Sequence, residues 1–210
     1  MTVADLIERH RRHLPAVAGV FARGEPGWWR RARPEADLVR AGVPDFGGLF
    51  SMAVPTWDAD PAAVLDAVGA AAAPDRRPFA LWTHAGVDDP LATECWQREL
   101  KLHSQLAIMA LTGRPAEPPT GSVCEVGTPA EARRFRGVHA LQRDVGEDDP
   151  VIAHWCHGHA GRLTAALCHR VFDEGADVVF LQATPLGRPV YRGLGFGDLG
   201  LASRWVAGGV

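Results

Sequence analysis

Helix starts and strand-length apolar runs alternate along this chain, and this alternation limits it most strongly to an α/β fold. An N-cap residue followed by proline, which favours the start of a helix, occurs at 60–61, 89–90, 128–129 and 184–185. Apolar runs of strand length lie at 49–54, 79–83, 105–111, 122–126, 178–183 and 201–206. We therefore expect an α/β (α+β) sandwich in which helices flank a mixed or largely parallel sheet.

A segment rich in proline and glycine at 112–121 is typical of a linker and predicts two halves, 1–111 and 122–210. Helix, strand, helix and strand follow one another in both halves at an offset of roughly 100 residues. The recurrence has two explanations, a duplicated module or the chance self-match of any α/β chain. Within the first 45 residues we expect one amphipathic helix at 3–14 and then an irregular stretch, whose Trp28 and Trp29 plug the edge of the core.

Composition excludes several classes of protein. The net charge of −3 gives no positive field for nucleic acid or an anionic membrane. No apolar run is long enough to span a bilayer, and the N-terminus does not have the pattern of a signal peptide. The 4 cysteines are scattered rather than arranged as a disulfide framework. We predict a cytoplasmic protein that binds neither nucleic acid nor membrane.

The residues at 161–175 predict a helix that follows a glycine-containing loop and precedes a buried strand. Gly175 is the expected stop of this helix. A loop that leads into a helix N-terminus presents unpaired N–H groups and the positive end of the helix dipole to an anion. In a rival interpretation Asp149 and Pro150 open one helix over 151–173, which would remove this anion site. The apolar stripe of the helix is expected at Ala160, Leu163, Leu167 and Val171.

Two segments of the C-terminal half together resemble the GNAT superfamily of N-acetyltransferases. The first is Pro189-Val190-Tyr191 followed by Leu194-Gly195-Phe196, which contains the only tyrosine of the chain. The second is the loop at 155–160, on which the family signature Gln/Arg-x-x-Gly-x-Gly/Ala falls. Gly158 and Ala160 match that signature, whereas Trp155 replaces its first residue.

The resemblance implies an enzyme that transfers acetyl from acetyl-CoA to a small-molecule amine, with no metal. Tyr191 corresponds to the general acid that protonates the departing thiolate of CoA, and His154 is the best-placed candidate for the general base. The residues expected to bind the cofactor are His157, Gly158, His159, Ala160, Gly161 and Arg162.

The C-terminal module is shorter than the family pattern. Only about a dozen residues separate the helix that starts at Pro129 from the loop at 155, which is room for one short strand. We expect the sheet edge left open by this deletion to be covered by the N-terminal half or by a second chain in a homodimer.

Three interpretations remain open at this point. The chain is either an acetyltransferase or a catalytically inactive binding or scaffold protein derived from the GNAT fold. The third interpretation is a metal-binding protein, because histidine and thiolate groups suit zinc. Its candidate ligands are His154, Cys156, His157, His159, Cys168 and His169.

Overall fold

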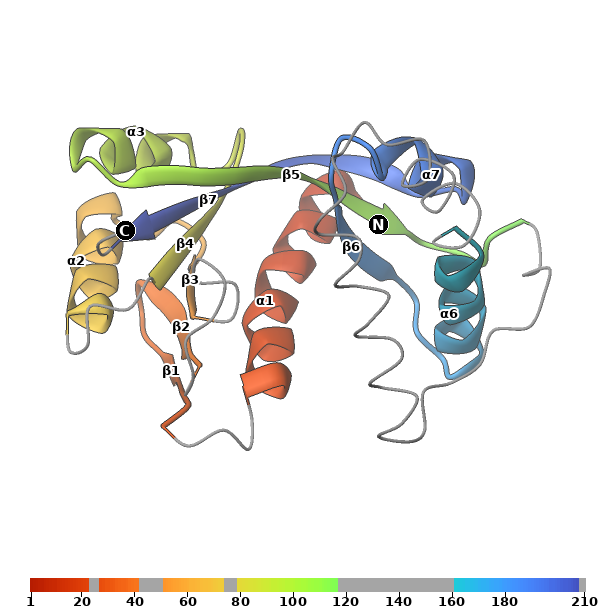
Figure 1. Ribbon diagram of the computed structural model, residues 1–210, viewed down its shortest axis with the longest axis horizontal. Coiled ribbons are helices and arrows are strands. Elements are labelled where there is room, and N and C mark those ends of the chain that lie inside the picture. The colour runs from red at the N-terminus through yellow and green to blue at the C-terminus, as the bar shows by residue number, and fades with distance from the viewer. Residues whose placement is uncertain (23–26, 42–50, 74–78, 117–160, 208–210) are drawn as a thin grey trace, which may run out of the picture. The chain divides into compact units, whose positions relative to one another are not determined.

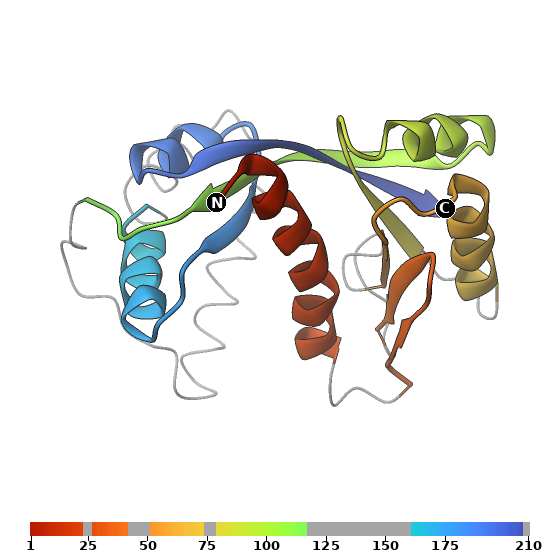
Figure 2. The ribbon, with the colours of Figure 1, turned by 180° about the vertical axis from the view of Figure 1, so that it is seen from behind.

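The computed structural model describes residues 1–22, 27–41, 51–73, 79–116 and 161–207 (Figures 1 and 2). These residues divide into an N-terminal unit, 1–108 with 199–210, and a C-terminal unit, 109–198. The unit that contains the N-terminal half thus also contains the last strand of the chain. The predicted boundary at 112–121 stays a prediction, because half of that segment lies outside the described residues, as do the elements expected at 122–126 and from 128 onward.

The strands form one mixed sheet in the order β1-β2-β3-β4-β7-β5-β6. Strands β3 and β4 are parallel, whereas the pairs β1–β2, β2–β3 and β4–β7 are antiparallel. The predicted α/β fold, with a mixed sheet flanked by helices, is confirmed. The described elements are α1 (Val3–Ala22), β1 (Trp29–Ala32), β2 (Ala36–Arg40), β3 (Met52–Pro55), α2 (Pro61–Ala72), β4 (Phe79–His84), α3 (Asp89–Gln97), β5 (Lys101–Leu111), α6 (Gly161–Asp173), β6 (Val179–Ala183), α7 (Arg188–Gly193) and β7 (Gly197–Ala207).

The core of the N-terminal unit has two layers, one on each face of the sheet. Phe79 and Leu81 of β4 belong to the cluster under α2 and α3, and Ala80 and Trp82 belong to the cluster on the side of α1. This alternation is the period of two that a strand buried on both faces requires. Trp29 packs against the first cluster and Trp28 against the second, which agrees with the predicted role of both residues at the edge of the core.

The ends of α2 and α6 follow from local chemistry that the sequence displays. The carboxylate of Asp60 accepts the Ala63 N–H at 3.0 Å and so caps α2. Gly175, at φ +96°, ends α6. Its N–H donates to Phe172 O, and the next N–H donates to Val171 O, which is the Schellman pattern.

Three sequence expectations about local structure are wrong. Helix α1 does not end at residue 14 but continues through the buried Pro15 to Ala22. The stretch that follows is not irregular, since it contains β1 and β2. Helix α7 starts at Arg188 rather than directly after Pro185, because the Thr184 hydroxyl accepts the Gly187 N–H and closes a turn first.

The buried face of α6 also differs from the prediction. The side chains of Leu163, Leu167 and Val171 are exposed, whereas Ala165 and Cys168 are buried. The small side chains therefore form the packed side of this helix, and the apolar stripe expected from the sequence faces outward.

The order helix, strand, helix, strand recurs as predicted. Elements α2, β4, α3 and β5 have counterparts in α6, β6, α7 and β7, and corresponding elements begin between 96 and 100 residues apart. We call these the N-terminal repeat (61–111) and the C-terminal repeat (161–207).

Candidate functional site

The start of α6 and the middle of α7 lie next to each other in the C-terminal unit. Gly161 is the first residue of α6 and is buried. A Cβ at this position would lie 3.3 Å from Cγ1 of Val190, so glycine allows the two helices to approach closely. The structure thus places Gly161 against Val190 of α7, and Val190 directly precedes Tyr191 in the chain.

Tyr191 is half-buried on α7. Its ring meets Phe196 edge to face, with 6.0 Å between the ring centroids. It also covers Gly187, where an added Cβ would be 3.0 Å from Cε2 of the tyrosine. Both neighbours fix the position of the ring, so a short helix holds the phenol in a defined place.

A pair of arginines ties α7 to the beginning of β7. Arg188 Nε donates to Asp198 Oδ1 at 2.7 Å, and Arg192 Nε donates to Asp198 Oδ2 at 2.8 Å. The hydrogen bond from Arg188, and then the one from Arg192, lower the pKa of the Asp198 carboxyl below its usual value. The carboxylate therefore stays charged and keeps the helix that carries Tyr191 in place.

Besides Gly161 and Tyr191, Arg162 is the one residue predicted for catalysis or cofactor binding that lies within the described residues. Arg162 is exposed in the first turn of α6. His154, His157, Gly158, His159 and Ala160 lie outside the described residues, as does the choice between a loop and one long helix before Gly161. Of the predicted metal ligands, Cys168 is a buried free thiol whose pKa is raised by burial. Within the described parts of the chain, no group of three His, Cys, Asp or Glu could hold a metal ion.

The N-terminal unit contains a pocket at the end of its parallel pair of strands. The parallel ladder of β3 and β4 pairs Met52 with Ala80 and Ala53 with Leu81, although both strands continue beyond these residues. A cavity of ≈ 430 Å³ lies where the chain leaves these strands, lined by 55–59 and 86–88 among others. Its charged side chains are those of Arg11, Asp58 and Asp88.

An anion does not suit the start of α2. The Asp60 side chain already accepts one of the free N–H groups of this helix and adds a negative charge there. The first turn of α6, in contrast, has no acidic residue and includes Arg162. Of the two repeats, the C-terminal one therefore has the helix start at which a diphosphate would be favourable.

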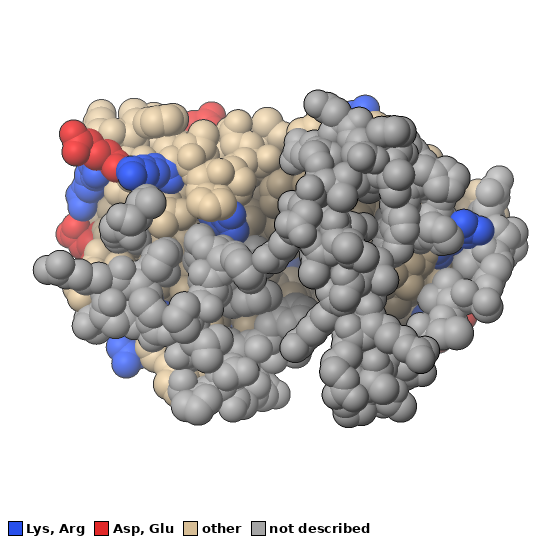
Figure 3. Space-filling model, viewed as in Figure 1, with Lys and Arg blue, Asp and Glu red and all other residues tan. Residues whose placement is uncertain are grey.

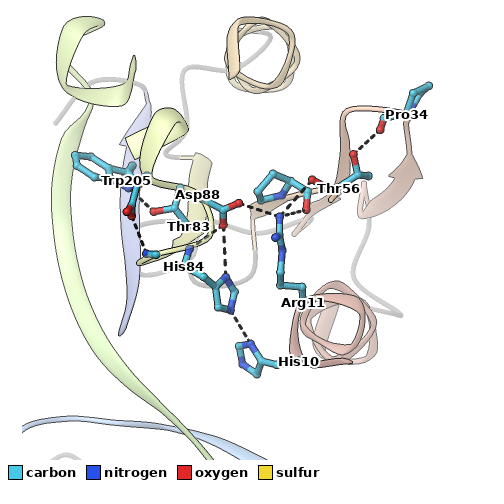
Figure 4. A network of polar contacts seen from close by, with 11 residues as sticks. His10, Arg11, Pro34, Thr56, Thr83, His84, Asp88 and Trp205 are labelled. Atoms are coloured by element: carbon cyan, nitrogen blue, oxygen red, sulfur yellow. Dashed lines mark hydrogen bonds and ion pairs between the residues drawn. The ribbon is translucent and has the colours of Figure 1, made fainter. Parts of the chain in front are cut away.

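A buried polar network in the N-terminal unit joins α1 to the loop between β4 and α3 (Figure 4). His10 Nδ1 lies 3.1 Å from His84 Nε2. The backbone N–H of His84 donates to Asp88 Oδ2 at 2.8 Å, and Arg11 Nη2 lies 3.1 Å from Asp88 Oδ1. Arg11 also donates to the carbonyl of Pro55 at 2.8 Å. Each of the four side chains that form this network is less than a tenth exposed.

The network keeps His10 neutral. Burial first, and then the neighbouring His84 and His13, lower the pKa of His10 to about 3. Neither imidazole of the His10–His84 pair lines the cavities at Arg11. The arrangement therefore ties α1 to the sheet, and its members Arg11 and Asp88 also line the cavity at 55–59 and 86–88.

Sequence reasoning missed this network. Its members come from residue 10 to residue 88, and a separation of 74 residues between the paired histidines leaves no local pattern. The sequence contains only a weak sign of the network: His84 ends a mostly apolar strand, and Asp88 follows four residues later.

Charges of opposite sign lie next to each other where the described surface is visible in Figure 3, at the end formed by α2 and α3. Arg98 there pairs with Asp66 at 2.7 Å and with Glu94 at 3.0 Å. None of the helices in the described ranges is both long enough and apolar enough to span a membrane.

Comparisons with known proteins give one clear result, which concerns the fold. No family model matches the chain, and no curated protein matches it. A solved structure of a GCN5-related N-acetyltransferase from Kribbella flavida matches with a TM-score of 0.61 at 16% sequence identity. The match covers 94% of this chain and 96% of that one. The chain has a GNAT-like fold over almost its whole length.

Proposed function

Because the chain has a GNAT-like fold, we propose that it transfers an acyl group from acetyl-CoA to an amine and that the C-terminal unit carries the reaction. One observation carries this proposal: the buried Gly161 at the start of α6 lies against Val190 of α7, the residue that precedes Tyr191 in the chain. The helix that the sequence predicts after the cofactor loop thus packs on the helix that carries the candidate general acid. The acetyltransferase named in the structural match supports the same class of reaction.

The diphosphate of the cofactor would be held at the start of α6. If a loop leads into α6, as the sequence predicts, unpaired N–H groups and the helix dipole would favour an anion there, and Arg162 adds a positive charge in the same turn. The sequence extends this site to His157, Gly158, His159 and Ala160. The start of α2 has the opposite character, because the Asp60 carboxylate occupies it.

Tyr191 would act on the leaving group. When the amine nitrogen attacks the thioester carbonyl, the carbon–sulfur bond breaks and the thiolate leaves with the bonding electrons. The phenol Oη–H then supplies a proton to that sulfur, and the nitrogen loses one to a base, for which the sequence offers His154. Packing against Phe196 and Gly187 orients the phenol for this step.

Binding is tested by the thermal stability of the purified protein with acetyl-CoA. A ligand at about 100 times its dissociation constant adds about 2.7 kcal/mol to the stability of the fold that binds it. We expect Arg162→Gln to weaken this effect by about tenfold in apparent dissociation constant. Arg170→Gln is the matched control, since Arg170 lies on the same helix, is exposed and pairs with Glu174 at 3.0 Å. No rise in Tm at millimolar acetyl-CoA would contradict the proposal.

Catalysis is tested separately with Tyr191→Phe. Loss of a general acid lowers turnover by about 10²-fold or more and leaves the affinity for acetyl-CoA unchanged. Release of free CoA thiol in the presence of a panel of primary amines is the measurement. A wild-type protein that binds acetyl-CoA but acetylates no amine would support the inactive GNAT-derived binding protein instead.

A further inference from the structure

The cavity of ≈ 430 Å³ in the N-terminal unit has a mostly apolar lining with a few charged side chains. We call it the Asp58 cavity, because Asp58 lines it and does not line the neighbouring cavity of ≈ 370 Å³. Its volume lies within the range typical of small-molecule sites. Proline, alanine, valine, leucine and tryptophan side chains make up most of the lining, which suits a ligand with a hydrocarbon part better than a hydrated metal ion.

The charges in the lining of the Asp58 cavity do not cancel. One arginine, Arg11, opposes two carboxylates, and it pairs with Asp88 at 3.1 Å (Figure 4). The charge of Asp58 is therefore left over. The neighbouring cavity does not supply a free cation to balance it, because its other arginines are themselves paired: Arg12 with Glu8, Arg30 with Asp37 and Arg33 with Glu35.

Asp58 is also the carboxylate that has hydrogen-bonding capacity left for a ligand. The other three carboxylates in or beside the lining each accept a backbone N–H: Asp60 from Ala63, Asp88 from His84 and Asp89 from Gly86. The Asp58 carboxylate, in contrast, forms no hydrogen bond or ion pair with any residue that the structure describes. A donor that carries a positive charge would satisfy it.

An indole ring lies next to this carboxylate along the chain. Trp57 lines the cavity and is 47% exposed, and the guanidinium carbon of Arg11 lies 5.2 Å from the centroid of its ring. The ring thus already attracts one cation, and its exposed part can attract a second. The turn that carries it is fixed, because the Thr56 hydroxyl donates to Pro34 O at 2.5 Å and the Ala59 N–H donates to Thr56 O at 3.4 Å.

We propose that the Asp58 cavity binds an organic ammonium ion that carries an apolar group. The ammonium group pairs with the Asp58 carboxylate and lies against the ring of Trp57, while the apolar group fills the cavity. An anion would instead be repelled by the unpaired charge of Asp58. This inference does not rest on the acyl-transfer reaction, since every residue that carries it belongs to the N-terminal unit.

Isothermal titration calorimetry with benzylammonium tests the proposal on the full-length protein. Acetyl-CoA is left out, so that no acetyl transfer can take place. We expect benzylammonium to bind at least about tenfold more tightly than benzyl alcohol, its neutral counterpart, and we expect no heat with benzoate. Equal binding of benzyl alcohol or benzoate, or no binding of benzylammonium at millimolar concentration, would overturn the proposal.

The left-handed backbone of Asp58 allows a variant that keeps the turn. Asp58 has φ +58°, a conformation that asparagine also adopts readily. Asp58→Asn should weaken the binding of benzylammonium by about tenfold and leave that of benzyl alcohol unchanged. Glu99→Gln is the matched control, because Glu99 is exposed, has φ +57° and lies outside the cavity. Equal affinity in the two variants would place benzylammonium elsewhere on the protein and refute the assignment.

The contact with the indole has its own pair of variants. Trp57→Leu should weaken the binding of benzylammonium by about threefold, because leucine has no ring face to attract the cation. Trp96→Leu is the control, since Trp96 is 61% exposed and lies outside the cavity. If both leucine variants bind benzylammonium as tightly as the wild type does, the ligand does not lie against Trp57 and the proposal fails.

Discussion

The two repeats share an order of elements but differ in how deeply they are buried. Every residue of β4 in the N-terminal repeat is buried, whereas four of the five residues of β6 in the C-terminal repeat are only partly buried. Helix α2 buries six of its residues, and α6 buries three, of which two are glycine and alanine. Of the two repeats, as far as the structure describes them, the N-terminal one therefore contributes more residues to the core.

The residues at the ends of β4 and β6 also differ in how deeply they are buried. His84 ends β4 and is buried against His10 and Asp88. Its counterpart at the same offset, Thr184, is exposed and only closes a turn with Gly187. The same order of elements therefore carries a buried polar network in one repeat and an exposed turn in the other.

The largest expected effect is on packing, at positions 100 residues apart in the two repeats. Leu81→Ala should lower the free energy of unfolding by about 2–5 kcal/mol, because this side chain is fully buried under α2 and α3. Leu181→Ala should cost about half of that or less, since Leu181 is only partly buried. Urea unfolding followed by tryptophan fluorescence gives both values. Equal losses would show that the two repeats contribute alike to the core.

Acid should destabilise the network at the end of β4. The pKa of His10 is about 3 in the fold and returns to its ordinary value of 6.5 on unfolding. Between these values the unfolded chain binds a proton that the folded chain does not. The free energy of unfolding therefore falls as pH is lowered from 6.5, by about 1.4 kcal/mol per pH unit from this group.

His10→Gln isolates this contribution. We expect the variant to be less stable than the wild type at pH 8, because His84 loses its partner, but to show a shallower decline toward acid. Urea titrations at a series of pH values from 8 to 4 provide the measurement. An identical slope in both proteins would exclude His10 as the source.

The smallest expected effect concerns the starts of α2 and α6. Asp60→Ala should cost about 1 kcal/mol of stability, because the Ala63 N–H loses its cap, and Asp60→Asn should restore most of it. Neither change should alter the Tm rise produced by acetyl-CoA if that ligand binds at α6. A larger rise in the alanine variant would move the cofactor site to the N-terminal repeat, because this change removes the carboxylate that disfavours an anion at the start of α2.

Local chemistry predicted much of the architecture. The Asp60 cap and the apolar run at 79–83 placed α2 and β4, and Gly175 marked the end of α6. The recurrence of elements in the two repeats was also visible. These features need only neighbours along the chain, since hydrogen-bonded caps and side-chain periodicity act within a few residues.

The residues of the candidate site stay a prediction. Gly161 and Tyr191 were selected from the sequence, and the structure adds the packing of Gly161 on α6 against Val190 on α7. The face of α6 was predicted wrongly, because periodicity favours the large apolar side chains at 163, 167 and 171. The close approach of a neighbour instead selects small residues such as Ala165 and Cys168 for the buried side.

The sequence by itself therefore determined the fold class, most of the helices and strands, and the repeated order of elements. Only the tertiary structure decided that the arginine-rich stretch forms β1, because an exposed edge strand carries charges rather than an apolar pattern. It also decided the His10–His84 pair and the ion pair between Arg11 and Asp88. Each of these features depends on contacts between residues far apart along the chain, and no property of a local segment encodes such contacts.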